Sequence, residues 1–259
     1  MLENQSYPQS AVSRRAQMRA LAPVGSSPCS YARICGVLYL LIIAAGLFAQ
    51  FVRERFIVPG DAAATARNIT GDAFVFRLGL VADLSTFVCA VALTVILFGL
   101  MRPVHRDAAM VMLAFNIVQD AIGGLNVLNT YRPLQLLGGA PYLRAFSREQ
   151  LEAMALLSLN SHSTGFNVAM IFFGCSCIAL GYLIFASGFL PKALGVLLPI
   201  AGLCYLTLSI ASLLSPRLAS MLFPAILVPA FIGELSFAAW LTVKGVDAAR
   251  WREAAERSL

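Results

Sequence analysis

The chain has 259 residues, of which 59% are hydrophobic and only 12% are charged. Soluble domains carry roughly 25% charged residues, so this composition excludes an ordinary soluble domain and indicates a membrane protein. The net charge of +6 does not require nucleic acid, because membrane proteins concentrate Lys and Arg in their cytoplasmic segments. We therefore predict the lipid bilayer, and not nucleic acid, as a partner.

Both ends of the chain are polar. Residues 1–30 contain three prolines and the pair Arg14-Arg15, and the first apolar run begins only at Ile34. This stretch is too long for the charged region of a signal peptide, so we predict a disordered cytoplasmic tail. Residues 247–259 mix acids and arginines around Trp251, which predicts a short amphipathic helix on the cytoplasmic surface.

Six apolar segments are long enough to cross a bilayer, whose hydrocarbon core requires about 20 residues of helix. They cover Ile34–Val52, Phe74–Leu100, Ala108–Leu128, two runs between Thr164 and Ser215, and Met221–Val243. We predict one all-α domain over residues 31–246, a polytopic bundle of six transmembrane helices.

Local signals mark the ends of several helices. Asp61 follows Pro-Gly and precedes three alanines, as a helix cap does, and Gly188 can close the fourth span in a left-handed conformation. Ser147 begins a capping-box pattern, which predicts an amphipathic helix on the membrane surface within a long connection before the fourth span. Pro224 and Pro229 predict a kink in the last span.

The charge of the connecting segments predicts the orientation. With an even number of spans and the N-terminus inside, the inner side carries eleven Lys and Arg residues and the outer side seven. Positive residues favour the cytoplasmic side, so we expect both termini in the cytoplasm of a bacterial inner-membrane protein.

Polar residues inside the spans are the candidates for function, because a charge at the centre of a bilayer costs about 2.5–3.5 kcal/mol on insertion scales. The third span carries one polar face, with residues spaced three and four apart, that must meet other helices or a water-filled cavity. This face consists of Asn116, Gln119, Asp120, Gly123 and Asn126.

We predict a polar cavity that opens outward and binds a small or lipid-like molecule. By helical rise, Asp83 and Asp120 share a layer about 12–14 Å below the outer surface, and Glu234 lies deeper as the floor. The full candidate set is Arg77, Asp83, Asn116, Asp120, His162 and Glu234, with Arg77 as counter-ion and His162 at the entrance. Alternatively, Arg77 extends to the interface and the acids are hydrogen-bonded contacts between helices.

No motif for catalysis or for a metal emerges. The two histidines, His105 and His162, fall on opposite sides of the predicted membrane, and Cys175 and Cys177 lack the spacing of a redox or zinc pair. The six cysteines lie mostly in apolar runs, where a thiol behaves as a small hydrophobe. We predict no cofactor, no metal and no catalytic residue, which favours a protein that is not an enzyme.

Short motifs occur in order in both the loops and the spans. They are Ala32–Leu40, Ile57–Ala62, Phe76–Gly79, Leu100–Val104, Phe172–Gly174, Ser187–Pro191 and Gly233–Ser236. These motifs resemble a bacterial multi-pass membrane family classified only as a domain of unknown function, of the DUF4386 type. The resemblance covers Tyr31 to Val246 and implies six helices and a bacterial inner-membrane location, with no established activity.

Three functions remain open from the sequence. The first is binding or transport of a small or lipid-like molecule in the polar cavity, with a proton linked to Glu234 or Asp120. The second is a non-catalytic membrane sensor or partner subunit that acts through the cytoplasmic tails. The third is an intramembrane enzyme acting on lipid, for which the sequence offers no nucleophile or metal site. The oligomeric state cannot be read from the sequence.

Overall fold

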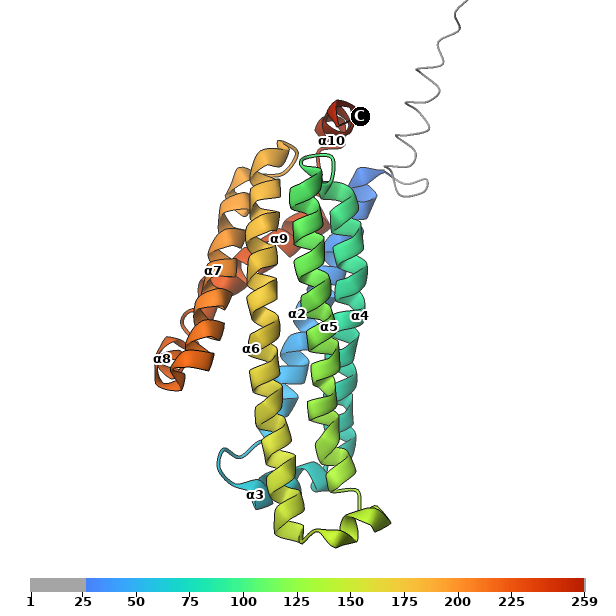
Figure 1. The fold of residues 1–259 in the computed structure, drawn as a ribbon. Coiled ribbons are helices and arrows are strands. Elements are labelled where there is room, and N and C mark those ends of the chain that lie inside the picture. The colour runs from blue at the N-terminus through green and yellow to red at the C-terminus, as the bar shows by residue number, and fades with distance from the viewer. Residues whose placement is uncertain (1–26, 259) are drawn as a thin grey trace, which may run out of the picture.

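The computed structural model describes residues 27–258, and the chain forms helices throughout this range (Figure 1). The long helices run side by side along one axis, and the short helices lie at their ends or flank. The elements are α2 (Pro28–Phe56), α3 (Ala62–Gly71), α4 (Ala73–Met101), α5 (Arg106–Leu136), the 3-10 helix η1 (Pro141–Ala145), α6 (Arg148–Ser187), α7 (Lys192–Leu214), α8 (Pro216–Leu222), α9 (Leu227–Val243) and α10 (Ala248–Arg257).

Six helices form a closed ring. Each packs on the next in the order α2, α4, α5, α6, α7 and α9, and α9 packs back on α2. Within residues 27–258, five helices are long and apolar enough to cross a membrane, and α8 with α9 makes a sixth span if the bent pair is counted as one. The predicted all-α polytopic bundle is therefore confirmed.

The last span is broken, as its prolines predicted. Helices α8 and α9 are bent by 59° at residues 223–226, which include Pro224. Proline has no N–H to donate to the preceding turn, and its ring clashes with the helix backbone there. Helix α9 alone has 17 residues and therefore reaches along only part of the ring.

The predicted surface helix before the fourth span was wrong. Ser147 does form the capping box with Gln150, but the helix that it starts continues without interruption for 40 residues to Ser187. Helix α5 also extends past the predicted end of its span, to Leu136. The reason is that a capping box fixes only where a helix begins, no proline lies near residue 163, and Gly165 remains inside the helix.

The two chain ends also differ from their predictions. Helix α2 begins at Pro28, capped by Ser27, so the last three residues of the predicted tail are helical. The rest of that tail, residues 1–26, lies outside the described residues. Helix α10 has the predicted amphipathic character, but it packs on the bundle through Trp251, Ala254 and Ala255.

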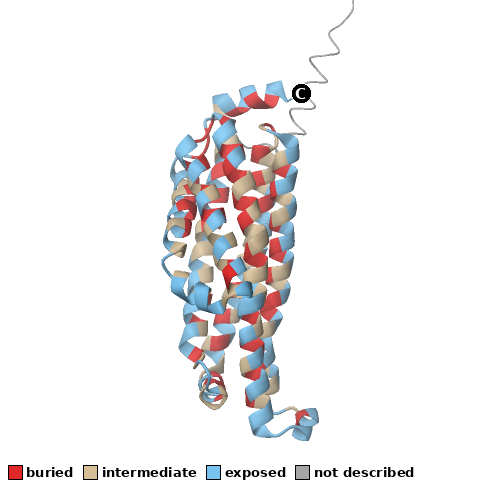
Figure 2. Ribbon diagram, turned by 60° about the vertical axis from the view of Figure 1, so that its left-hand side comes forward, coloured by how far each residue is buried: buried red, intermediate tan, exposed pale blue. Residues whose placement is uncertain are grey.

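Helix α10 covers one end of the ring (Figures 1 and 2). The indole Nε1 of Trp251 donates a buried hydrogen bond of 2.9 Å to the carbonyl oxygen of Leu100, at the end of α4. Arg250 Nη1 donates to the carbonyl oxygen of Gly188, in the turn between α6 and α7. We call this end of the bundle the α10 end. The opposite end, where α3 lies, is the α3 end.

The interior differs between the two halves of the ring. In the α10 half, one large apolar cluster joins residues of α2, α4, α5, α6, α7, α9 and α10. At the α3 end a much smaller apolar cluster forms around Val52, Phe56, Ile69, Phe76 and Leu159. The buried polar side chains Asp83, Asn126 and His162 lie along the stretch that separates the two clusters.

Two glycines allow α6 and α7 to pack closely. A Cβ atom added at Gly174 would lie 2.8 Å from the carbonyl oxygen of Gly202, and one added at Gly202 would lie 2.5 Å from that of Gly174. Small residues let helix backbones approach in this way inside membranes. Helix α6 ends at Gly188, which has the predicted left-handed conformation.

Candidate functional site

The polar face of α5 is directed into the bundle, as the sequence predicted. All five of its members are buried: Asn116, Gln119, Asp120, Gly123 and Asn126. Glycine at position 123 is required by the packing, because the ring of Phe87 on α4 occupies the space that a side chain would fill. This contact also fixes the register between α4 and α5.

Asp83 on α4 belongs to a buried ion-pair network. Arg53 Nη1 on α2 donates to Asp83 Oδ2 at 2.7 Å, and His162 Nε2 on α6 lies 3.4 Å from the same oxygen. The side chains of Arg53, Asp83 and His162 are only 12%, 10% and 7% exposed, respectively. His162, which the sequence placed at the entrance of a cavity, is thus buried beside Asp83.

The predicted counter-ion was wrong, because Arg53 and not Arg77 pairs with Asp83. Arg77 is exposed on α4. Side chains in a helix lean toward its N-terminus, so Arg77 leans out toward the α3 end. Arg53 lies near the C-terminal end of α2, which runs in the opposite direction, and its side chain therefore leans back into the bundle toward Asp83.

Hydrogen bonds extend the network from His162 to the α3 end of α5. Asn126 Nδ2 donates to the carbonyl oxygen of His162 at 2.8 Å, and Asn129 Nδ2 donates to Asn126 Oδ1 at 3.0 Å. Arg132 Nη1 donates to Asn129 Oδ1, also at 3.0 Å. Side chains from α2, α4, α5 and α6 are thus linked from the buried carboxylate of Asp83 to an exposed arginine.

Asp120 differs from Asp83 because its carboxylate is buried without a partner. The residue is 4% exposed, and neither carboxylate oxygen has a hydrogen-bond partner among the described residues. An ionised carboxylate removed from water in this way costs several kcal/mol unless it is paired or protonated. Asp120 therefore carries a proton or meets a group that comes from outside the described residues.

Glu234 forms a third, separate site on the other side of the ring. Tyr39 on α2 and Tyr205 on α7 lie close to its carboxyl group. Its Oε1 atom is buried without a hydrogen-bond partner among residues 27–258. Tyr39 also packs edge-on against Phe237, with ring centroids 6.1 Å apart.

Packing contacts order Asp83 and Asp120 along the bundle. Asp83 lies four residues to the α3 side of Phe87, and Asp120 lies three residues to the α10 side of Gly123, which the Phe87 ring contacts. The Phe87 ring leans toward the N-terminus of its helix, so the Cα of Phe87 lies nearer the α10 end than Gly123 does. Asp83 is therefore nearer the α3 end than Asp120, by less than the roughly 10 Å that seven residues of helix span.

Glu234 lies deeper in the bundle than Asp83, measured from the α3 end. The contacts of α2 with Gly79 through Val52, and with Phe237 through Tyr39, are thirteen residues or about 20 Å apart. Counting along α4 and α9 from these contacts places Glu234 roughly 9 Å closer to the α10 end than Asp83. The register that these packing contacts set, and not the span boundaries, decides the depth of each acid.

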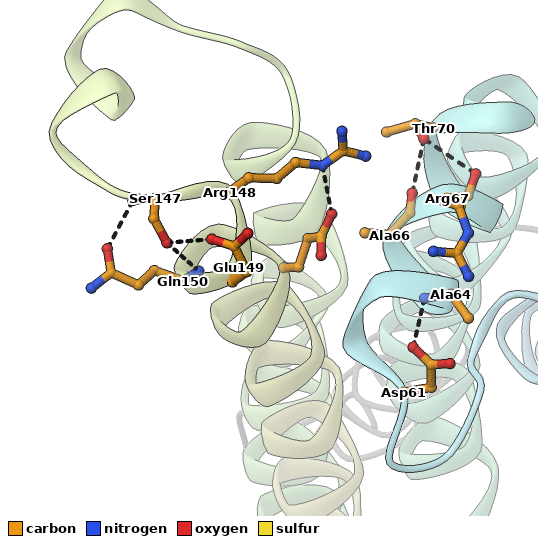
Figure 3. A network of polar contacts seen from close by, with 10 residues as sticks. Asp61, Ala64, Ala66, Arg67, Thr70, Ser147, Arg148, Glu149 and Gln150 are labelled. Atoms are coloured by element: carbon orange, nitrogen blue, oxygen red, sulfur yellow. Dashed lines mark hydrogen bonds and ion pairs between the residues drawn. The ribbon is translucent and has the colours of Figure 1, made fainter.

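Two hollows lie at the α3 end. One, of about 380 Å³, is bounded by the end of α5, η1 and α6. The other, of about 360 Å³, lies between α3, the α5–α6 connection and the start of α6. Figure 3 shows the second region, where Arg148 extends from α6 toward α3 and is held by Glu152 at 2.8 Å.

Comparison with known families matches residues 34–245 to a family described as "Domain of unknown function (DUF4386)". The chain belongs to this family. It is also 28% identical, over 156 residues, to a protein of Archaeoglobus fulgidus described as "Uncharacterized protein"; the match covers 60% of this chain and 76% of that protein. No solved structure matches the chain.

Membership of this family gives no activity to assign to the polar residues, so their roles rest on geometry. Within residues 27–258, no group of three or more His, Cys, Asp or Glu side chains could hold a metal ion. The candidate set predicted from the sequence omitted Arg53, which pairs with Asp83, and Tyr39 and Tyr205, which lie close to Glu234. The side-chain direction in antiparallel helices was the signal that could have identified Arg53.

Proposed function

We propose that this membrane protein binds or transports a small or lipid-like molecule in the polar interior of the bundle, with Asp120 as the binding group. One observation carries this proposal: both oxygens of the Asp120 carboxylate are buried without a partner among the described residues. Ionisable residues inside membrane spans are rare and commonly mark a substrate or proton pathway.

The surroundings of Asp120 support a ligand rather than a structural role. Asn116 and Gln119 lie on the same buried face, within one turn of the helix, and offer amide donors and acceptors. Asp83, in contrast, already has Arg53 and His162 as partners. Without a partner, the Asp120 carboxyl group must keep its proton. A ligand with a hydrogen-bond donor or a positive charge would stabilise the carboxylate in place of that proton.

In this proposal the α3 end faces outward and both termini lie in the cytoplasm of a bacterial inner membrane. The excess of Lys and Arg on the predicted inner side supports this orientation. The apolar cluster and α10 close the α10 half, which supports access to Asp120 from the α3 end.

Mass spectrometry of molecules that co-purify with the protein in a mild nonionic detergent tests the proposal. We expect a defined molecule bound to the wild type and lost from Asp120→Asn, with the fold of the variant verified by thermal melting. Glu152→Gln is the matched control, because Glu152 is an equally buried acid that is already paired with Arg148. No bound molecule in the wild type, or equal occupancy in Asp120→Asn, would contradict the proposal.

A second candidate is a sensor or partner subunit that acts through α10. The observation in its favour is the docking of Trp251 on the end of α4, because it joins the C-terminal helix directly to the bundle. Deletion of residues 247–259 would then abolish the output and leave ligand binding unchanged. In a binding or transport protein, neutralising Asp120 would have the larger effect.

A further inference from the structure

The larger hollow at the α3 end has the size and the lining of a ligand site. Its volume of about 380 Å³ falls within the range of small-molecule sites, roughly 300–1,000 Å³. Most of its wall is apolar, and the polar groups gather on α5 and on one side of α6. The lining consists of Arg132, Gln135, Leu136, Tyr142, Leu143, Met154, Leu157, Ser158 and Ser161.

This hollow lies beyond the apolar part of α6. The apolar run begins near Thr164, and residues 148–163 before it extend for about 24 Å. Yet Leu157, Met154 and Tyr142 are 65%, 41% and 71% exposed there. Apolar side chains gathered in a hollow outside the lipid tails indicate a site for an apolar group.

The positive charge of the hollow indicates that the rest of the ligand is anionic. Arg132 is the one charged residue that lines it, and Asn129 Oδ1 accepts a hydrogen bond from Arg132 Nη1 that orients the guanidinium. A guanidinium has five N–H donors in a planar fork that suits carboxylate and phosphate groups. Gln135 and Tyr142 can add an amide and a hydroxyl donor beside it.

We propose that this hollow binds an amphiphile with one anionic head group and an apolar chain. The head group pairs with Arg132, and the chain lies along Leu136, Leu157 and Met154. The site goes beyond the function proposed above and does not depend on it. Asp120 is not among the residues that line the hollow.

The test uses the full-length protein in a neutral detergent, with oleate as the probe and oleyl alcohol as its uncharged counterpart. Native mass spectrometry should show one oleate per chain and much weaker binding of the alcohol. Arg132→Gln should weaken oleate binding about tenfold, because a charge-assisted contact is lost. The matched control is Arg217→Gln on α8, another exposed arginine, which should bind oleate as the wild type does.

Three outcomes would overturn the assignment. The first is equal affinity of wild type and Arg132→Gln for oleate, and the second is equal binding of oleate and oleyl alcohol. The third is a lipid-free dimer that Leu157→Gln dissociates, which would assign the apolar wall to a second copy of the chain. Asp120→Asn should retain oleate binding, which separates this site from the interior one, and a loss there would place oleate at Asp120 instead.

Discussion

The α10 half and the α3 half are built from the same long helices, but they hold those helices together in different ways. In the α10 half a continuous apolar cluster reaches from α2 to α10 and includes Phe237 and Trp251. In the α3 half an arginine, a histidine and two asparagines link four helices around Asp83. Apolar packing depends mainly on shape, whereas a charged network depends on each partner, so the two halves should respond differently to substitution.

The largest loss of stability is expected in the apolar half. Phe237 is fully buried, and Phe237→Ala removes a large side chain and leaves a cavity between α2 and α9, at a cost of about 3–5 kcal/mol. The matched control is Phe231→Ala on the same helix, because Phe231 is 43% exposed. Thermal melting in detergent should show a large drop for the first variant and a small one for the second. Equal drops would mean that this cluster does not hold the α10 half together.

In the polar half, Asp83→Asn should be the most damaging substitution. It leaves the Arg53 guanidinium buried without its carboxylate, which should lower the free energy of unfolding by about 1–3 kcal/mol. The loss is limited because Arg53 lies near the end of its helix. The double variant Arg53→Gln with Asp83→Asn should recover part of this loss. If Asp83→Asn alone melts with the wild type, the ion pair is not a structural contact.

The hydrogen bond that holds α10 on the α10 half should contribute less to stability. Trp251→Phe retains most of the packing but removes the hydrogen bond from Nε1 to Leu100, which should cost about 1 kcal/mol. Trp240→Phe is the control, since Trp240 is 38% exposed. Hydrogen exchange along α10 should increase in the first variant only. Unchanged exchange would show that apolar contacts alone hold α10.

Asp120→Asn tests most directly whether Asp120, unlike Asp83, lacks a partner. Because the carboxylate has no partner among the described residues, neutralising it should leave the melting temperature equal to that of the wild type or higher. A loss as large as that of Asp83→Asn would reveal a partner for Asp120 and remove the basis for a ligand there.

The smallest effect is expected at the exposed start of α6. The pKa of Glu149 is lowered by a hydrogen bond from its own backbone N–H and by the Ser147 hydroxyl, 2.8 Å from Oε2. A lowered pKa in the folded state means stabilisation above the unfolded pKa, which disappears as the pH falls through the folded pKa. Hydrogen exchange in the first turn should therefore be faster in Glu149→Gln at pH 7 and equal to the wild type in acid. A difference that persists in acid would exclude the charge as its cause.

The sequence by itself determined the elements of this protein. Runs of about twenty apolar residues must form helices in a membrane, because no water is present to satisfy the backbone, and the apolar runs therefore predicted the bundle. Gly188 and the prolines of the last span act through their own backbone geometry, so the turn and the break were also predictable. The burial of the α5 polar face followed from helical spacing alone.

Only the tertiary structure decided which of these residues meet. Contacts such as Gly123 with Phe87 and Gly79 with Val52 set the register between helices, and a shift of three or four residues moves a side chain by about 5 Å. The direction of α2 made Arg53, not Arg77, the partner of Asp83. Local patterns carry no information about register between helices, because register arises from the packing of side chains far apart in the sequence.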